Sequence, residues 1–275
     1  RNATVLIVGD IMLDQFAIGR VNRISPEAPV PIVEFEHDEY RVGGASNVAH
    51  NVRALGGAVE LVGLTGTDGA GQRLRRLLEE LGIGTSGLIA DPQRRTTTKL
   101  RIVTDRNQQV ARIDYETDRE ASGATEEALA AQAEQMAGQA GVIVVSDYLK
   151  GTVTRGLMAR IVAAARDRSI PVLVDPKIPH IEYYSGTTLV TPNHHEAETA
   201  THMRIRTHEE AEAAARVFRT RTGCERVLIT RGDQGMCLLD GAAAEHFPAV
   251  AREVSDVTGA GDPVIATLAL GLAAG

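Results

Sequence analysis

Short apolar runs rich in β-branched residues alternate along the chain with longer amphipathic or alanine-rich segments. The short runs predict buried strands at 4–8, 60–64, 141–146, 172–175, 188–191 and 226–230. The longer segments predict helices at 46–55, 69–81, 125–140, 154–168, 208–222 and 262–274. This alternation indicates right-handed crossovers, so we expect an α/β fold with a mostly parallel central sheet and helices on both faces.

Two stretches, 16–41 and 96–115, depart from this rhythm. In both, apolar and polar residues alternate, which is typical of half-exposed antiparallel strands. We expect the two stretches to pair as a small β sheet that forms a lid over one end of the main sheet. The whole chain, 1–275, is then a single domain with an inserted lid.

The composition restricts the core and the partners of this fold. Hydrophobic residues make up 43% of the 275 residues but aromatic residues only 3%, so Val, Leu, Ile and Ala must fill the core. The net charge of −7 argues against a general nucleic-acid or anionic-membrane surface. The longest apolar stretch, 264–274, is too short to span a bilayer, and no signal peptide is visible. With two cysteines, Cys224 and Cys237, interpreted as free core thiols, we expect a cytoplasmic protein.

The strongest chemical signal is the sequence Gly-Ala-Gly-Asp at 259–262, directly before a predicted helix. Backbone N–H groups in such a turn, together with the helix dipole, suit the charge of a transferring phosphoryl group. An acid in the first helical turn, here Asp262, can accept a proton from an attacking hydroxyl. The alternative is that Asp262 only caps the helix.

A second glycine turn, with Gly43, Gly44 and Asn47, also leads into a predicted helix. Glycine permits close approach of a ligand, and the Asn47 amide can bind sugar hydroxyls, although capping of the helix is an equal alternative. Asp10 and Asp14 follow the first strand, where a carboxylate can accept hydrogen bonds from vicinal hydroxyls, and Asp14 is the stronger candidate.

Two later segments suit a nucleotide and its metal ion. Asn193 and Glu196 lie three residues apart on a first helical turn, a spacing that suits hydrated Mg²⁺ near phosphates. The adjacent His194 and His195 also suggest a zinc site. We disfavour this interpretation because neighbouring histidines point apart and no third soft ligand is near. The segment 230–235 predicts a hairpin turn that either borders a nucleotide or is only a turn.

The predicted lid carries three cations, Lys99, Arg101 and Arg112, with Asn107 and Gln109 between them. They either form a solvated charged face or hold a phosphate that is already present on a sugar.

These segments together resemble the PfkB (ribokinase-like) family of carbohydrate kinases. The shared features are Gly-Asp after the first strand, Gly-Gly-x-x-Asn at 43–47, Asn-x-x-Glu at 193–196, and Asp-x-x-Gly-Ala-Gly-Asp at 256–262. Their order and spacing cover almost the whole chain. Within this family, the segments 23–31, 98–101, 107–109, 149–151 and 174–177 resemble the heptose 7-phosphate kinases of bacterial ADP-heptose synthesis.

The resemblance implies a role for each matching residue. Asp262 would be the general base for the anomeric hydroxyl, and the anion hole would consist of Gly259, Ala260 and Gly261. The sugar phosphate would contact Asp14, Gly43, Gly44, Asn47, Lys99, Arg101, Asn107 and Gln109. The nucleotide site would contain Lys177, Asn193, Glu196, Thr230, Arg231, Gly232, Gly235, Asp256 and Thr258.

The same resemblance implies ATP and Mg²⁺ as cofactors, with Asn193 and Glu196 binding the metal through water. It also implies a monovalent cation such as K⁺ and a homodimer formed through the lid. The sequence departs from the family in two places: Pro263 replaces the usual Thr, and no Asn/Ala-rich segment follows Gly275 to complete the adenine pocket. The alternatives are another sugar kinase, for ribose or fructose, and a sugar-phosphate sensor without catalysis.

Overall fold

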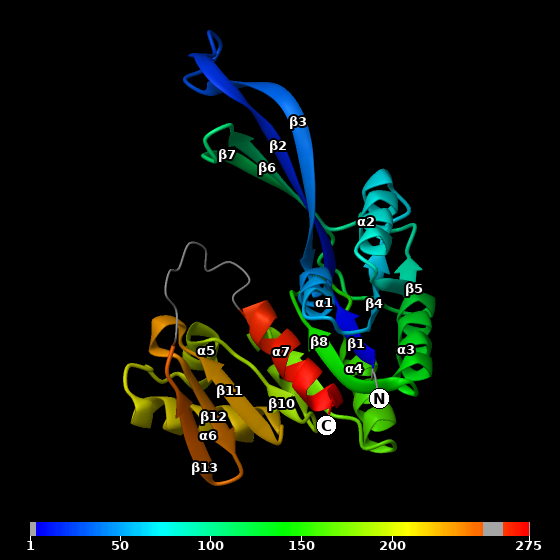
Figure 1. The fold of residues 1–275 in the computed structure, drawn as a ribbon, viewed down its shortest axis with the longest axis vertical. Helices are drawn as coiled ribbons and strands as arrows, with labels where there is room; N and C mark the ends of the chain where they lie inside the picture. Colours follow the sequence, from blue (N-terminus) through cyan, green and yellow to red (C-terminus); the bar gives the residue numbers. More distant parts are fainter. Residues whose placement is uncertain (1–3, 250–260, 275) are drawn as a thin grey trace.

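The computed structural model describes residues 4–249 and 261–274, and it contains a large sheet from which a smaller sheet projects (Figure 1). The strands of the large sheet are β1 (Thr4–Gly9), β4 (Val59–Thr65), β5 (Gly84–Ala90), β8 (Ala140–Ser146), β9 (Val172–Asp175), β10 (Leu189–Val190), β11 (Arg226–Thr230), β12 (Met236–Asp240) and β13 (Ala243–Phe247). Their order is β13-β12-β11-β10-β9-β8-β1-β4-β5.

Neighbouring strands from β11 through to β5 run parallel, and only β12 and β13 are antiparallel additions at one edge. The mostly parallel sheet predicted from the sequence is therefore confirmed. The two edge strands, β5 and β13, were not predicted from the sequence. Glycines interrupt the apolar positions of β5, and β13 is half-exposed and alanine-rich, so neither gives the signal of a buried strand.

Helices cover both faces of the sheet, as predicted. They are α1 (Ala45–Ala54), α2 (Gly69–Glu80), α3 (Ala124–Ala137), α4 (Arg155–Arg166), α5 (His194–Thr201), α6 (His208–Thr222) and α7 (Gly261–Ala274), with 3₁₀ turns η1 (Ile178–Tyr184) and η2 (Gly232–Gln234). Most predicted helix ends agree within one or two residues. The α3 helix ends three residues earlier than predicted, at Ala137, before Gly138.

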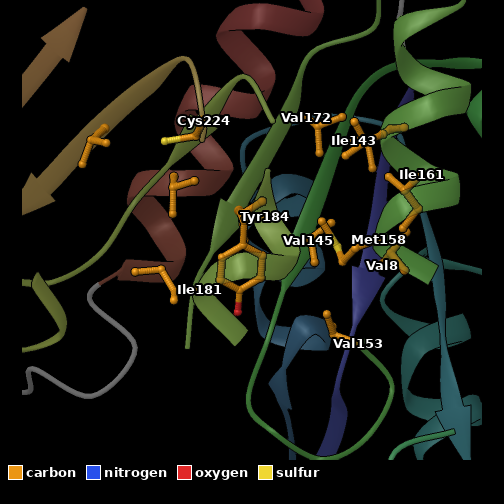
Figure 2. Close-up of a cluster of buried hydrophobic side chains, with 14 of the residues drawn as sticks. Val8, Ile143, Val145, Val153, Met158, Ile161, Val172, Ile181, Tyr184 and Cys224 are labelled. Carbon is orange, nitrogen blue, oxygen red and sulfur yellow. The ribbon is translucent and has the colours of Figure 1, made fainter. Parts of the chain in front are cut away.

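Successive residues of the central strands point into two separate cores, because side chains alternate between the faces of a strand. Leu6 and Val8 of β1 pack in the core that α3, α4, α5 and α6 cover, part of which Figure 2 shows. Val5 and Ile7 pack in the other core, beneath α1, α2 and α7. Burial on both faces explains why these strands are continuous apolar runs in the sequence.

The small sheet contains β2 (Ile11–Ile24), β3 (Pro31–Gly44), β6 (Thr98–Thr104) and β7 (Gln109–Tyr115), in the order β3-β2-β6-β7. The predicted pairing of the two distant stretches is confirmed, but β2 and β6 join in parallel, whereas each hairpin is antiparallel. Both strands leave the large sheet from the same end and therefore run in the same direction (Figure 1). The lid also begins five residues earlier than predicted, because only Asp10 separates β1 from β2.

Gly9, the last residue of β1, lies directly beside Ser146 of β8. A Cβ at position 9 would lie 2.0 Å from the Ser146 carbonyl oxygen. We expect Gly9→Ala to lower the free energy of unfolding by about 2 kcal/mol, because the two strands must separate to admit the methyl group. Equilibrium urea denaturation followed by circular dichroism measures the change.

The matched control is Gly271→Ala in α7, where a Cβ would have no neighbour within 4 Å among the described residues. This variant should gain up to about 1 kcal/mol from higher helix propensity. An unchanged stability of Gly9→Ala would contradict the close approach of β1 and β8.

Candidate functional site

The carboxyl ends of β1, β8 and β9 bring acidic residues from three parts of the chain to one edge of the sheet. Asp10 follows β1, Asp147 follows β8, and Asp175 ends β9. The first turn of α7, which carries Asp262, lies at the same edge, within hydrogen-bonding distance of residues from α1 and from the loop after β8. Ligands of parallel α/β sheets bind at this edge, so the location agrees with the expectation from the sequence.

Asp262 is 3% exposed, and its carboxylate is held by two donors from different elements. Its Oδ2 accepts a hydrogen bond of 2.6 Å from the Asn47 amide, and its Oδ1 accepts one of 3.2 Å from the Tyr148 hydroxyl. Burial raises the pKa of the Asp262 carboxyl above its ordinary value, and these two hydrogen bonds oppose the rise. A buried, fixed carboxylate with a raised pKa suits a general base.

The loop after β8 is held by the buried carboxylate of Asp10. Its Oδ2 accepts from the N–H groups of Tyr148 at 2.8 Å and Lys150 at 3.0 Å, and its Oδ1 accepts from that of Thr152 at 2.9 Å. The backbone carbonyl of Asp10 also accepts the N–H of Ala45, the first residue of α1. A single residue thus anchors both segments that reach Asp262, a structural role that the sequence did not predict.

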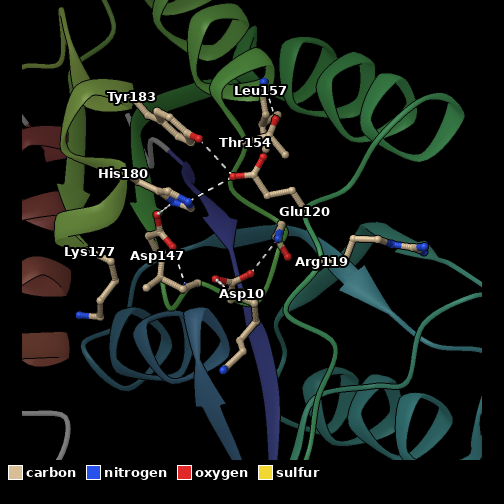
Figure 3. A network of polar contacts seen from close by, with 12 residues as sticks. Asp10, Arg119, Glu120, Asp147, Thr154, Leu157, Lys177, His180 and Tyr183 are labelled. Carbon is tan, nitrogen blue, oxygen red and sulfur yellow. Dashed lines mark hydrogen bonds and ion pairs between the residues drawn. The ribbon is translucent and has the colours of Figure 1, made fainter.

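A second buried carboxylate, Asp147, organises the neighbouring side chains (Figure 3). Its Oδ2 lies 2.7 Å from Nδ1 of His180 and accepts a bond of 2.8 Å from the Tyr184 hydroxyl. Nε2 of His180 lies 3.2 Å from Glu120, which also accepts from the Tyr183 hydroxyl. Burial disfavours the imidazolium, but the hydrogen bond to Asp147 and the nearby carboxylates outweigh it and raise the pKa of His180.

Lys177 lies near two acidic groups at this edge, Glu196 and Asp175. Its ammonium is 2.5 Å from Glu196 Oε1 and 5.5 Å from the centre of the Tyr148 ring. Burial raises the pKa of the nearby Asp175 carboxyl to about 7, although the Lys177 charge lowers it. Burial alone would lower the pKa of Lys177, but Asp175 and Glu196 outweigh that effect and raise it, so the ammonium remains charged.

Asn193 and Glu196 form a reciprocal capping box at the start of α5. Asn193 Oδ1 accepts from the N–H of Glu196 at 2.9 Å, and Glu196 Oε2 accepts from the N–H of Asn193 at 3.0 Å. Both oxygens of Glu196 are therefore engaged, one by Asn193 and one by Lys177. Hard oxygen donors suit Mg²⁺, and their existing bonds favour contact through the ion's water shell, as the sequence suggested.

The base of the lid gathers charges on one face. Asp14, Lys99 and Asp114 are cross-strand neighbours on β2, β6 and β7, and Arg101 bonds Asp14 Oδ1 at 2.5 Å. Arg112 instead pairs with Asp114 at 2.7 Å. Cross-strand neighbours share a face of the sheet, so these groups form one patch of mixed charge.

Arg41 is a further cation of the lid that was not among the candidates from the sequence. It lies opposite Asp14 on β3, and its guanidinium is 4.8 Å from the centre of the Phe16 ring.

Asn107 and Gln109 lie at the turn between β6 and β7 and are exposed. Gln109 pairs with Val103, four residues along β6 from Lys99, which at 3.3 Å per residue corresponds to roughly 13 Å. The structure therefore does not bring these two amides together with the cations at the base.

Gly43 and Gly44 allow β3 to approach the aspartates closely. A Cβ at position 43 would lie 2.5 Å from Asp14 Oδ2, and one at position 44 would lie 2.3 Å from the Asp10 carbonyl oxygen. Gly44 also has a φ of 57° at the start of α1, a conformation that favours glycine. The two glycines therefore have a packing role that the sequence alone did not reveal.

The segment 230–235 forms the predicted hairpin between β11 and β12. Arg231 is 5% exposed, and its guanidinium bonds the side chains of His208 and Gln234 and lies 3.4 Å from the Arg206 carbonyl oxygen. Its donors are thus largely used within the protein. Thr230 and Gly232 lie in the same turn, and a Cβ on Gly235 would clash with the carbonyl oxygen of Phe247.

Part of the predicted phosphoryl-binding segment lies outside the described residues: Asp256, Thr258, Gly259 and Ala260. Gly261 is the first residue of α7, and Pro263 lies in its first turn, where a missing N–H removes no helical bond. The replacement of Thr by Pro at this position is therefore compatible with the helix.

Sequence reasoning did not identify Tyr148 as a neighbour of Asp262 or Asp175 as a neighbour of Lys177. Both residues lie at or just after the carboxyl end of a predicted strand, and that position was the available signal.

Cys224 and Cys237 are buried free thiols, as predicted. Across residues 4–249 and 261–274, no helix has the length and apolarity needed to cross a membrane, and no cluster of three or more metal-binding side chains occurs.

A solved structure, that of Arabidopsis thaliana ribokinase complexed with ribose and ATP, has a similar fold. It matches this chain with a TM-score of 0.77 at 18% identity, covering 100% of this chain and 87% of the other. At this level of identity the match establishes the fold alone, and it confirms the predicted ribokinase-like architecture.

Two curated relatives are much closer in sequence. The D-beta-D-heptose 7-phosphate kinase of Bordetella bronchiseptica is 47% identical over 273 residues, which cover 99% of this chain and 85% of the relative. The bifunctional protein HldE of Citrifermentans bemidjiense is 45% identical over 271 residues, which cover 98% of this chain but 55% of the relative. The chain thus spans about half the length of the bifunctional relatives. The pfkB family carbohydrate kinase model matches residues 2–275, and the chain belongs to this family.

Proposed function

We propose that the protein transfers the γ-phosphoryl group of ATP to the anomeric hydroxyl of D-glycero-β-D-manno-heptose 7-phosphate, giving the 1,7-bisphosphate for lipopolysaccharide core synthesis. The observation that carries the proposal is the buried Asp262 carboxylate, fixed by Asn47 and Tyr148 at the start of α7. The choice of acceptor is supported by the Bordetella relative, which is named for heptose 7-phosphate, and by the cations at the base of the lid.

In the proposed reaction, Asp262 accepts the proton of the anomeric hydroxyl while the sugar oxygen bonds to the γ-phosphorus. The bond from that phosphorus to the bridging oxygen breaks, and ADP leaves with the electron pair. The N-terminus of α7 presents backbone N–H groups and the positive end of its dipole to the transferring group. Gly259, Ala260 and Gly261 are the residues that we assign to this anion hole.

We assign the sugar ring to Asp14, Gly43, Gly44 and Asn47, and the 7-phosphate to Lys99, Arg101 and Arg112. The phosphate would compete with Asp14 for the Arg101 guanidinium, which already forms an ion pair. Arg41 adds a further cation on the same face of the lid. Asn107 and Gln109 would contact the acceptor only if the turn between β6 and β7 moves toward the base.

The nucleotide is assigned to Lys177, Thr230, Arg231, Gly232, Gly235, Asp256 and Thr258, and hydrated Mg²⁺ to Asn193 and Glu196. Mg²⁺ would neutralise phosphate charge when bound, and the carboxylate and amide oxygens of the capping box fit its preference. The Lys177 ammonium, paired with Glu196, is a second positive charge for the phosphates. A monovalent cation such as K⁺ near the anion hole rests on the family resemblance.

We further propose a homodimer formed through the lid, located in the cytoplasm where ATP is available. The support is the set of large apolar side chains that the lid exposes: Val21, Ile24, Val30, Phe35, Val110, Ile113 and Tyr115. Phe35 is 63% exposed, and burial against a second copy would remove this apolar surface from water.

Assays with a panel of sugars and sugar phosphates test which acceptor the enzyme uses. We expect ATP-dependent phosphorylation of heptose 7-phosphate, with the new phosphoester on C1 in phosphorus NMR, and at least tenfold lower kcat/KM for ribose, fructose and unphosphorylated heptose. Equal use of neutral sugars would refute the phosphate-binding lid. Binding of heptose 7-phosphate without any turnover would instead favour a sensor.

Asp262→Asn should lower kcat by at least about 100-fold while sugar-phosphate binding, measured by calorimetry, stays within about threefold. The amide cannot accept the proton, and general-base catalysis contributes on the order of 100- to 10,000-fold. Retention of wild-type turnover would remove Asp262 from the role of base.

Lys99→Met combined with Arg101→Met should raise KM for heptose 7-phosphate by at least about 100-fold, because two charge-assisted bonds are lost and each contributes about 1.5–3 kcal/mol. The control is Arg106→Met, which removes an exposed cation at the tip of the lid and should leave KM unchanged. Equal KM values for the two variants would contradict the assignment of the 7-phosphate to the base of the lid.

A further inference from the structure

The two donors to Asp262 come from segments that are far apart in the chain. Asn47 lies on α1, and Tyr148 lies on the loop after β8. The loop is short and firmly held, since Asp10 accepts the backbone N–H groups of residues 148, 150 and 152. The Tyr148 hydroxyl therefore reaches Asp262 from a fixed point of the backbone.

The environment of Tyr148 keeps its hydroxyl protonated. Burial raises the pKa of this phenol strongly, and the negative charges of Asp262 and Asp175 raise it further. The hydroxyl can thus act as a hydrogen-bond donor throughout the physiological pH range. Its ring lies beneath the Lys177 ammonium at 5.5 Å, and this contact restricts the ring from a second side.

We propose that Tyr148 is a positioning residue for Asp262, whose phenol fixes Oδ1 while Asn47 fixes Oδ2. With one oxygen held from each side, the carboxylate cannot rotate about its Cβ–Cγ bond, and its remaining lone pairs keep one orientation toward the acceptor hydroxyl. The family motifs quoted from the sequence do not contain Tyr148. This inference rests on the proposed function, because it assumes that Asp262 is the base.

Other charged groups also act on Asp262 and must remain unchanged in a test. Lys177 lowers the pKa of Asp262, and Lys177 is in turn paired with Glu196 and influenced by Asp175. From α1 the neutral Asn47 donates to the carboxylate. Removing only the Tyr148 hydroxyl leaves all these groups in place, so the change in proton affinity of Asp262 reports the missing bond.

The experiment compares Tyr148→Phe with the wild type. A hydrogen bond to a carboxylate stabilises its ionised form, so its loss should raise the pKa of Asp262 by about one unit. The acid limb of the kcat profile should move to higher pH by the same amount, because the ionised base is then lost at a higher pH. On the plateau, kcat should fall about 10- to 100-fold through misorientation, with KM within about twofold.

The matched control is Tyr183→Phe, which removes the hydroxyl that bonds Glu120 rather than Asp262. Its pH profile and kcat should equal those of the wild type. Thermal unfolding of both variants checks that the fold is intact. An unshifted acid limb together with unchanged kcat in Tyr148→Phe would overturn the proposal.

A second readout does not depend on turnover. Carbon-13 NMR of the aspartate carboxyl groups, with the Asp262 signal assigned from Asp262→Asn, measures the pKa of Asp262 directly. A rise of about one unit in Tyr148→Phe supports the positioning role even if heptose 7-phosphate proves not to be the substrate. An unchanged pKa overturns it even if the kinase reaction is confirmed.

Discussion

The buried carboxylate of Asp10 is the interaction on which the catalytic end of the sheet depends. A carboxylate removed from water is costly unless its oxygens are hydrogen-bonded, and here three backbone N–H groups of the loop after β8 satisfy that need. The carbonyl of the same residue receives the first N–H of α1. One residue at the end of β1 therefore determines where Tyr148 and Asn47 lie, and these two determine where the carboxylate of Asp262 lies.

The parallel sheet gathers several acids into a small volume, and the protein balances them with few cations. Asp147 pairs with His180 and accepts a hydrogen bond from the Tyr184 hydroxyl, whereas Asp175 and Glu196 share Lys177. Burial raises the pKa of Asp175 to about 7, and the neighbouring acids add to this rise while Lys177 opposes it. Such an arrangement suits a kinase site. A phosphate can replace an acid as the partner of a cation, and a metal ion can replace a cation as the partner of an acid.

Much of this molecule could be predicted from its sequence. The buried strands and amphipathic helices have strong periodic signals, and these predicted the parallel sheet and its covering helices. The anion site assigned to the glycine turn before Asp262 stays a prediction. Edge strands β5 and β13 lack such signals because they bury little. The bond between Asn47 and Asp262 joins residues 215 positions apart, and the contact of Tyr148 depends on the course of a loop. Neither contact has a local pattern, so only the folded chain reveals them.

The direct passage from β1 into β2 has a consequence for how acceptor preference can change. Only Asp10 separates β1, an interior strand of the large sheet, from the longest strand pair of the lid. Rotation of the whole lid relative to the large sheet would change the torsion angles of Asp10. Its side chain bonds the loop after β8 and its carbonyl bonds Ala45, and both interactions resist such a change. Under the proposed assignment of the sugar phosphate to the lid, acceptor specificity is therefore easier to change by exchanging side chains on its face than by rotating the lid as a whole.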